Sequence, residues 1–322
     1  MSQEEFVRLT SAWGKSRTPF FFLLDFEGKN PQAFLWEEAA AHGIFFRFKN
    51  QGNATPKKAL PGVNWTFSPI SFSEYQRRFN LVHRHILQGD SYLLNLTFPS
   101  QVQTDRTLEE LFHLGKAPYQ LLFQDRFAVF SPEGFVKMEG NEIATFPMKG
   151  TLDGKIENAE QVLLANTKEE WEHNTVVDLL RNDLAMVAKK IRVVRYRYTE
   201  RIPAGGKEIV QTSSEIRGTL PENWQENIGD ILLRLLPAGS ITGAPKAKTV
   251  EIIRAAELDE RGYYCGIFGI FDGEKVESAV AIRFLENRDG AFYFRSGGGI
   301  TALSQAQEEY QELQTKVYVP FV

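Results

Sequence analysis

Two Asp-Gly pairs near the C-terminus constrain the fold of this chain more than any other feature. Asp272-Gly273 divides the apolar stretch "YCGIFGIFDGEKVESAVAIRFLE", and Asp289-Gly290 precedes the apolar stretch "AFYFRSGGGI". An Asp-Gly pair between apolar runs is typical of a tight β-hairpin, so we expect antiparallel strands on both sides of each pair. Apolar runs bounded by turn residues predict further strands in 18–28, 43–52, 91–98 and 119–136.

Helices are predicted where apolar residues recur every three to four positions. The predicted ranges are 71–89, 168–190, 245–258 and 304–316. In the second range one apolar face is formed by Val176, Leu180, Leu184 and Val187. Lys189-Lys190 lie at the helix end that favours cations, and Ser304 with Gln307 forms a capping-box pattern at the start of the last helix. Strands and helices are mixed without a regular β-α-β alternation, and no Gly-, Ser- or Pro-rich linker divides the chain. This predicts one large α+β domain.

Charge and composition exclude several classes of protein. The 37 Lys and Arg residues and 41 Asp and Glu residues give a net charge of −4, which argues against a protein that binds nucleic acid irrespective of its sequence. The first residues lack the order of a signal peptide, and no apolar run approaches a membrane span, so we expect no membrane contact and a cytoplasmic location. The one cysteine, Cys265 in "YYCGIFG", favours an inert buried thiol.

Two pairs of glutamates stand out on the predicted helices. Glu169 and Glu172 are three residues apart on one helix, and Glu309 and Glu312 have the same spacing on another. Residues at this spacing share a helix face. If the two faces meet, four carboxylates require a cation, and oxygen ligands favour Mg²⁺. The alternative is two solvated acidic faces, which is the usual position of glutamate.

Two glycine-rich segments could approach a ligand through their backbone. In "LPAGSITGAPKAKTVEII", Ser240, Thr242 and Gly243 precede a helix that Pro245 can begin, which is an arrangement suited to an anionic group. The ordinary alternative is a capped helix start. The segment "SGGGI", 296–300, is either a second close backbone approach or a flexible loop.

Several long motifs in order resemble one family of enzymes. They are "KEEWEHNTVVDLLRNDLA", "PAGSITGAPKAKTVEII", "YYCGIFG", "AIR" and "SGGGITALSQAQEEYQELQTK". Together they are similar to motifs of the chorismate-utilising enzymes, which include anthranilate, aminodeoxychorismate, isochorismate and salicylate synthases. The resemblance covers about residues 72–318. It implies two packed, mainly antiparallel β-sheets with helices outside, a chorismate-binding region in 72–322, and a shortened N-terminal part in 1–71 that lacks the family's tryptophan-binding motif.

Lys149 distinguishes among the members of this family. Its motif "PMKGT" resembles the "PIKGT" of aminodeoxychorismate synthase component I, whereas anthranilate, isochorismate and salicylate synthases lack this lysine. The resemblance implies that Lys149 attacks C2 of chorismate and expels the C4 hydroxyl, after which ammonia enters at C4 and expels the lysine. An amine attacks only when it is neutral, and burial together with a divalent cation would favour that form. The alternative is an exposed loop lysine.

The resemblance also implies roles for other positions. Glu133 in "SPEGF" matches the acid that protonates the departing hydroxyl. Glu172 and Glu312 match direct Mg²⁺ ligands, and Glu169 and Glu309 match the pair that holds the metal through water. The expected substrate-binding residues are Ser240, Thr242, Gly243, Tyr264 (or Tyr263), Arg283, Gly297, Gly298, Gly299 and Lys316.

Two positions depart from the family pattern, and one activity is absent from the sequence. Leu93 in "GDSYLLNL" replaces the family's glutamine, and Gln211 in "IVQTSSEI" replaces a histidine. No motif of a glutaminase is present, so we expect a separate glutamine amidotransferase subunit to supply ammonia. The alternatives are an anthranilate synthase component I, a hydrolytic isochorismate or salicylate synthase, and a catalytically impaired homologue that only binds the amidotransferase.

Overall fold

A computed structural model describes residues 1–55, 62–204 and 207–320 of the chain. Within these residues the strands form two nine-stranded, antiparallel sheets. The first sheet contains β1 (Phe20–Leu24), β2 (Gln32–Leu35), β9 (Gly134–Glu139), β10 (Glu142–Thr145), β11 (Met148–Asp153), β12 (Lys189–Ala204), β13 (Lys207–Thr219), β15 (Ile267–Phe271) and β16 (Val276–Val280). The second contains β3 (Ile44–Phe48), β4 (Gln51–Gly52), β5 (Trp65–Ser68), β6 (Leu93–Thr104), β7 (Tyr119–Phe123), β8 (Phe127–Ser131), β14 (Gly243–Ala244), β17 (Phe284–Arg288) and β18 (Ala291–Ile300).

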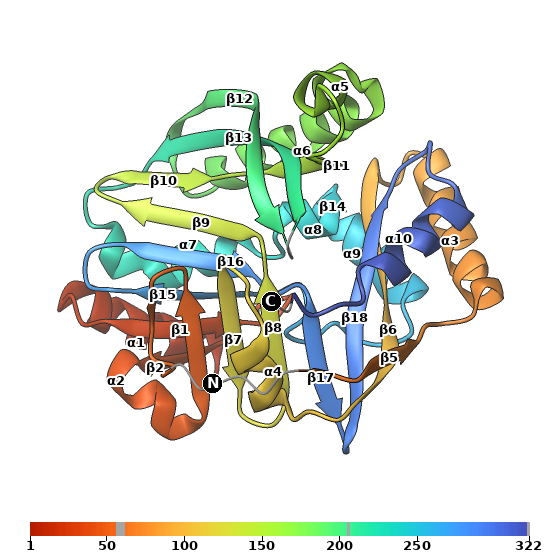
Figure 1. The fold of residues 1–322 in the computed structure, drawn as a ribbon. Coiled ribbons are helices and arrows are strands. Elements are labelled where there is room, and N and C mark those ends of the chain that lie inside the picture. The colour runs from red at the N-terminus through yellow and green to blue at the C-terminus, as the bar shows by residue number, and fades with distance from the viewer. Residues whose placement is uncertain (56–61, 205–206, 321–322) are drawn as a thin grey trace.

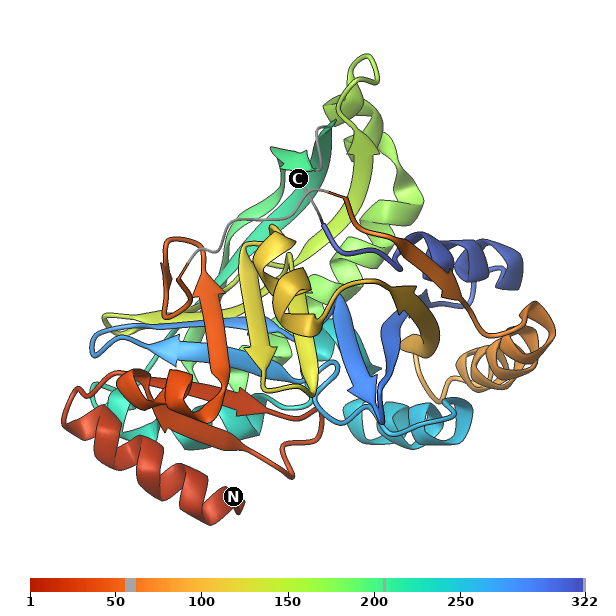
Figure 2. The ribbon, with the colours of Figure 1, turned by 60° about the horizontal axis from the view of Figure 1, so that its bottom comes forward.

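Helices cover the outside of the two sheets (Figure 1). They are α1 (Gln3–Lys15), α2 (Trp36–Ala39), α3 (Phe72–Leu87), α4 (Leu108–Leu114), α5 (Ala159–Ala165), α6 (Thr167–Ala185), α7 (Ile228–Leu235), α8 (Gly239–Thr242), α9 (Lys246–Ala256) and α10 (Ala306–Thr315), with 3-10 turns at Ala40–His42 and Trp224–Asn227. Figure 2 shows α3 in orange and α10 in blue side by side, on the side of the molecule where β18 ends. No helix among the described residues is both long enough and apolar enough to cross a membrane.

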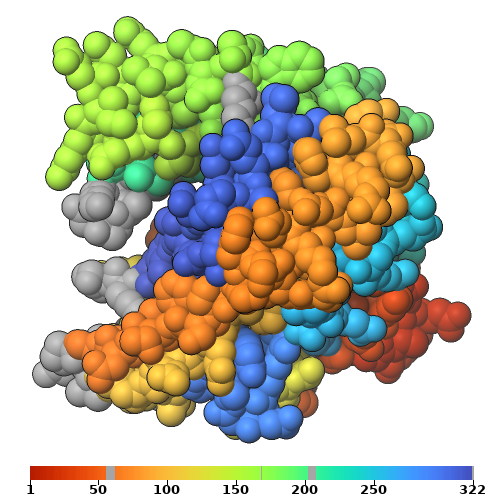
Figure 3. Space-filling view, turned by 90° about the vertical axis from the view of Figure 1, so that its right-hand side faces the viewer, coloured from red at the N-terminus to blue at the C-terminus, as the bar shows by residue number. Residues whose placement is uncertain are grey.

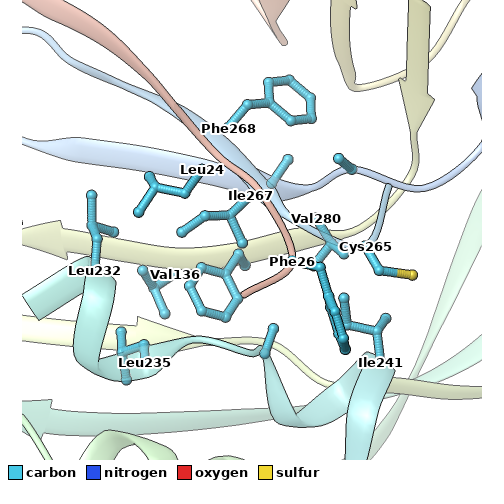
Figure 4. Packing of buried hydrophobic residues seen from close by; sticks show 14 of the residues in the cluster. Leu24, Phe26, Val136, Leu232, Leu235, Ile241, Cys265, Ile267, Phe268 and Val280 are labelled. Carbon is cyan, nitrogen blue, oxygen red and sulfur yellow. The ribbon is translucent and has the colours of Figure 1, made fainter. Parts of the chain in front are cut away.

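The core lies between the sheets and is rich in phenylalanine. All five residues of β1 are buried, and Phe21 of β1 stacks on Phe46 of β3 with ring centroids 5.0 Å apart. Phe48 of β3 meets Phe268 of β15 edge-on at 5.3 Å. Figure 4 shows how this packing continues from Phe268 and Leu24 to Leu232 and Leu235 of α7. Strands buried on both faces explain the nearly continuous apolar runs in this part of the sequence.

The predicted α+β class and both predicted hairpins are confirmed. Asp289 and Gly290 form the two-residue connection of β17 and β18, with φ of 52° and 90°, the left-handed backbone that this turn requires. The Asp272-Gly273 pair connects β15 to β16, and Asp272 Oδ1 accepts the Lys275 N–H at 2.9 Å. Strands from residues 1–71 pair within both sheets.

Two local predictions are wrong. The helix predicted for 168–190 ends at Ala185, and Lys189-Lys190 begin β12 because that segment pairs along β13. The capping box at Ser304 does not form, since α10 begins at Ala306 after Gln305, which makes no side-chain cap bond. Ser304 Oγ instead donates to Glu309 Oε1 at 2.7 Å. In the first case strand pairing, and in the second a side-chain contact five residues along the chain, takes the group that the local pattern had assigned elsewhere.

Candidate active site

A cavity of about 500 Å³ takes its walls from both sheets and from helices α6, α8 and α10. Its lining includes nearly all of the residues singled out from the sequence: Lys149, Glu133, Glu169, Glu172, Glu309, Glu312, Ser240, Thr242, Gly243, Tyr264, Arg283, Gly297, Gly299 and Lys316. Residues far apart in the sequence, such as Glu133 and Lys316, meet here. On the face drawn in Figure 3 the surface is hollowed between the yellow-green segment that carries α5 and the blue segment that carries α10.

Lys149 reaches the cavity from strand β11, where the pairing with β13 is irregular. Lys149 pairs with Thr212 and Thr151 pairs with Gln211, so Gly150 between them is a bulged residue. Gly150 has a φ of 79°, and a Cβ there would lie 3.1 Å from Glu169 Oε2. Only glycine fits this left-handed conformation at low cost. The "KG" pair in the sequence therefore encodes the bulge that follows the lysine.

The Lys149 amine is paired with a carboxylate of the predicted metal site. Its Nζ donates to Glu172 Oε2 at 3.2 Å, and the lysine side chain is 27% exposed. Burial lowers the pKa of Lys149, but the carboxylates of Glu172, Glu312 and Glu169 outweigh burial and raise that pKa above its ordinary value. This direction is opposite to the expectation from sequence, which counted burial and a divalent cation but not direct pairing with a carboxylate.

The two acidic helix faces, each predicted from the glutamate spacing, both line the cavity. A Cβ built on Gly298 of β18 would lie 3.1 Å from Glu309 Oε2 and 3.3 Å from Glu312 Oε1, so the glycine leaves room for both carboxylates. Glu312 is also paired with Lys316, whose Nζ donates to the Gly297 carbonyl at 3.0 Å. Gly298 therefore faces the acidic cluster, although it is not itself part of the lining.

These donors are of the kind that a hard divalent ion prefers, because all four are carboxylates directed into one cavity. Within the described ranges, however, no group of three or more Cys, His, Asp or Glu side chains is arranged to hold a metal ion. Glu172 is paired with the Lys149 ammonium group, Glu312 is paired with that of Lys316, and Glu309 accepts a hydrogen bond from Ser304. The four carboxylates are chemically suited to a hard divalent ion, but three of them already contact Lys149, Lys316 or Ser304.

Glu133 lies in the connection between β8 and β9, on the side of the cavity formed by α8. Burial raises the pKa of its carboxyl above the ordinary value, and a hydrogen bond with Ser240 and the positive charges of Lys149, Lys316 and Arg283 oppose this without cancelling it. A carboxyl with a raised pKa retains its proton to higher pH. The position is suited to a proton donor.

Other predicted substrate residues, Ser240, Thr242, Gly243 and Tyr264, line the cavity from α8, β14 and the segment before β15. Gly243 has a φ of 119°, and a Cβ there would lie 1.7 Å from the Leu93 carbonyl oxygen, so β14 can pair with β6 only with glycine at this position. Thr242 Oγ1 donates to the Ala238 carbonyl at 2.8 Å. Tyr264 lines the cavity, whereas the alternative Tyr263 donates to the Asn30 carbonyl at 2.9 Å and is absent from the lining.

The segment before α9 was expected to suit an anionic group. At its start the backbone N–H of Gly239 donates to Asp183 Oδ2 of α6 at 3.0 Å, so this N–H is already bound to a carboxylate of the chain itself.

The structure adds cavity residues that sequence reasoning missed. Asn95 of β6 and Arg295 of β18 both line the cavity. Arg295 is 5% exposed, and its Nε donates to Glu286 Oε1 at 2.6 Å. A polar residue inside an apolar strand is the only signal that either gives in the sequence. Leu93 and Gln211, the two departures from the family pattern, line the same cavity.

Two other residues have settings that bear on reactivity. Cys265 is buried as predicted, and burial raises the pKa of its thiol to about 11, which makes it a poor nucleophile. His173, next to Glu172 in the sequence, is fully buried, its Nε2 lies 2.6 Å from Ser214 Oγ, and burial lowers its pKa to about 4. It is not among the residues that line the cavity.

The cavity thus combines basic groups, an acid with a raised pKa and a cluster of carboxylates. Lys149, Arg283, Arg295 and Lys316 are cations on its walls. Such a site can bind a small polyanion together with a hard cation, protonate a leaving group and present an amine.

A family model described as chorismate binding enzyme matches residues 24–321. A Haemophilus influenzae protein named "Uncharacterized PabA-like protein" is 52% identical over 99% of this chain and 97% of its own length. Aminodeoxychorismate synthase component 1 of Escherichia coli is 34% identical over 78% of this chain and 57% of its own length. Anthranilate synthase component 1 of Archaeoglobus fulgidus is 31% identical over 77% of this chain and 61% of its own length.

The fold also matches a solved structure. MenF, the menaquinone-specific isochorismate synthase of Escherichia coli, superposes with a TM-score of 0.73, with 16% identity over 97% of this chain and 80% of that chain. This confirms the predicted arrangement of two antiparallel sheets with outer helices.

Proposed function

The chain belongs to the family of chorismate binding enzymes, and from that premise we propose that it is component I of an aminodeoxychorismate synthase (EC 2.6.1.85). It converts chorismate and ammonia to 4-amino-4-deoxychorismate, the precursor of p-aminobenzoate and folate. Lys149 is the observation that carries this proposal. A lysine at this position within the cavity supports a covalent route through its amine. The comparisons alone favour no single member, since identities of 34% and 31% are similar.

The residues of the cavity supply each step of this route. Arg283 and Lys316 bind the carboxylates of chorismate as charged hydrogen-bond donors. Lys149 Nζ forms a bond to C2 while the C4–O bond breaks, and Glu133 gives its proton to the departing hydroxyl, which leaves as water. Ammonia then bonds to C4 and the bond between Lys149 and C2 breaks, so the lysine leaves as the neutral amine and the enolpyruvyl group is kept. A proton of the new ammonium group returns to the Glu133 carboxylate and restores the acid.

Mg²⁺ is part of this proposal. Glu172 and Glu312 would hold it directly, and Glu169 and Glu309 through water. When bound, it supplies positive charge for a substrate carboxylate. For these carboxylates to serve as ligands, the Lys149 and Lys316 ammonium groups have to release Glu172 and Glu312. Release of Glu172 also removes the strongest of the interactions that raise the pKa of Lys149.

Ammonia comes from a separate glutamine amidotransferase subunit in this proposal. The one cysteine of the chain is buried within the core cluster, and its raised pKa opposes the thiolate that a glutaminase needs. The name of the Haemophilus influenzae relative and the component 1 name of the Escherichia coli relative support a partner of this kind.

Product identity tests the proposed function. The chain is incubated with chorismate, Mg²⁺ and an ammonium salt, and the product is identified by mass and fluorescence. Aminodeoxychorismate is the expected product. Anthranilate with pyruvate would instead establish an anthranilate synthase, and isochorismate or salicylate would establish a hydrolytic member. Absence of turnover even with an amidotransferase present would favour the impaired homologue, to which Leu93 and Gln211 point.

The pH dependence of turnover tests the role of Glu133. Because burial raises its pKa, the proton that it donates is present below that pKa, and turnover is expected to fall as pH rises through it. Glu133→Gln is expected to lower kcat by about 10²- to 10⁴-fold, the usual contribution of a general acid, and to remove this limb from the profile of kcat/KM against pH. Glu139→Gln, an exposed position on the following strand, is the control. A limb that persists in Glu133→Gln excludes this assignment.

A further inference from the structure

An ion pair between α6 and α9 stands next to a wall segment of the cavity. Asp183, in the last turn of α6, is 6% exposed. Its Oδ1 lies 2.7 Å from Lys246 Nζ of α9, and its Oδ2 accepts the Gly239 N–H of α8 at 3.0 Å. Lys246 Nζ also donates to the Leu235 carbonyl at 3.0 Å. Asp183 itself is not among the residues that line the cavity.

The contact with Gly239 is close and admits no side chain. A Cβ on Gly239 would lie 2.7 Å from Asp183 Oδ2, within the distance at which something must shift. The glycine therefore brings the backbone of α8 directly against the carboxylate. Because a buried carboxylate without partners is costly, Asp183 remains bound to its two donors. The start of α8 is fixed to α6 by this contact.

The segment that Asp183 fixes contains the hydrogen-bond partner of Glu133. Ser240, Ile241 and Thr242 follow Gly239 directly and line the cavity, and Ser240 is hydrogen-bonded to the Glu133 carboxyl. The first turns of α6 carry Glu169 and Glu172 into the same cavity. One helix thus bears two of the four clustered carboxylates near its start and the contact that anchors α8 near its end.

We propose that Asp183 is a positioning residue, which sets the Gly239–Thr242 wall, and through Ser240 the Glu133 carboxyl, at a fixed place relative to the acidic face of α6. The catalytic part of this proposal rests on the proposed function, because it assigns Glu133 a role in turnover. The anchoring part concerns the chain itself and can be measured without substrate.

A purely structural role makes a different prediction. If Asp183 only stabilised the fold, any loss of activity would follow the loss of stability among variants. Asp183→Asn keeps an oxygen that can accept the Gly239 N–H but leaves Lys246 without its counterion. Asp183→Ala removes both interactions. The Asp183→Asn/Lys246→Met double variant restores a neutral pair and serves as the rescue.

The experiment compares these variants with Asp178→Asn. Asp178 is on the same helix, is exposed and lies 3.2 Å from Arg181, so it is a matched control. For each protein we would measure the unfolding temperature, the kcat and KM for chorismate with ammonium, and amide hydrogen exchange of a peptide spanning 236–244. Activity is measured well below the lowest unfolding temperature.

In Asp183→Ala we expect kcat to fall about 10- to 100-fold, as misplacement of a catalytic group by about 1 Å can do, while KM changes by less than about 3-fold. The peptide 236–244 is expected to exchange at least about 10-fold faster, since the amide of Gly239 loses its acceptor. Asp183→Asn is expected to retain most of kcat and of this protection despite a lower unfolding temperature. The double variant is expected to recover both kcat and the protection of 236–244.

Three results would overturn the proposal. They are unchanged exchange of 236–244 in Asp183→Ala, a kcat in that variant equal to that of Asp178→Asn, and equal losses of kcat in the Ala and Asn variants. If Asp183→Ala does not fold, Asp183→Asn and the double variant decide through the same measurements. If the unmodified chain forms no aminodeoxychorismate, the proposed function fails, whereas hydrogen exchange still decides whether Asp183 anchors the wall.

Discussion

Replacing Lys149 with alanine is expected to lower chorismate turnover on the order of 10³-fold or more, because deletion of a nucleophile removes the covalent route itself. The unmodified chain, incubated with chorismate and Mg²⁺ in the absence of ammonia, is expected to gain the mass of chorismate less one water. Lys149→Ala is expected to gain none. Intact-protein mass spectrometry after rapid denaturation detects the adduct, and peptide mapping locates it.

The control for this experiment is Lys137→Ala. Lys137 also has a carboxylate partner, Glu277 at 3.2 Å, but lies on β9 outside the cavity. It should retain both turnover and the adduct. An adduct that persists in Lys149→Ala, or one that maps to another residue, would remove Lys149 from its assigned role. Loss of the adduct with turnover preserved would show that the amine is dispensable.

Replacing Glu172 or Glu312 with glutamine is expected to weaken Mg²⁺ binding by about 100-fold or more, since changes of residues that only support metal ligands already cost 10- to 100-fold. Each substitution removes a negative charge from the donor set that the two helices direct into the cavity. Metal affinity is measured directly by calorimetry with Mg²⁺ and by electron paramagnetic resonance with Mn²⁺. Turnover as a function of Mg²⁺ concentration is a second readout.

Glu170→Gln is the matched control for Glu172. It is two positions earlier on the same helix, its carboxylate lies 3.6 Å from Arg197, and it is absent from the cavity lining. Its metal affinity should equal that of the unmodified chain. Unchanged Mn²⁺ binding in both Glu172→Gln and Glu312→Gln would exclude these carboxylates as ligands and would leave their pairing with Lys149 and Lys316 as their main interaction.

Much of the fold could be read from local patterns. The Asp-Gly pairs predicted two hairpins because the turn backbone they require is rare for other residues. The apolar spacing of 71–89 predicted α3, which buries Tyr75, Phe79, Val82 and Ile86. The predictions failed where another partner took the group in question. Lys189-Lys190 belong to β12 because β13 offers a pairing partner, and the Ser304 hydroxyl donates to Glu309, five residues later, instead of capping the helix.

The sequence predicted many of the residues that line the cavity, but not which of their side chains contact one another. The glutamate spacing placed each pair on one face, and the family motifs identified Lys149 and Glu133. Neither showed that Lys149 is paired with Glu172, nor that Asn95 and Arg295 complete the lining. The buried contacts of Asp183 could not be predicted from the sequence, because a carboxylate on a helix is usually exposed and its two partners lie more than 50 positions away.

The sequence by itself determined the residue types, the turns and the faces, because these depend on backbone geometry within a few residues. Only the tertiary structure decided which charges face one another. The pairing of Lys149 with Glu172, and the burial of Asp183 against Gly239 and Lys246, follow from how the two sheets and α6 pack. Charges interact through space, and the distance between them is set by packing rather than by their separation along the chain.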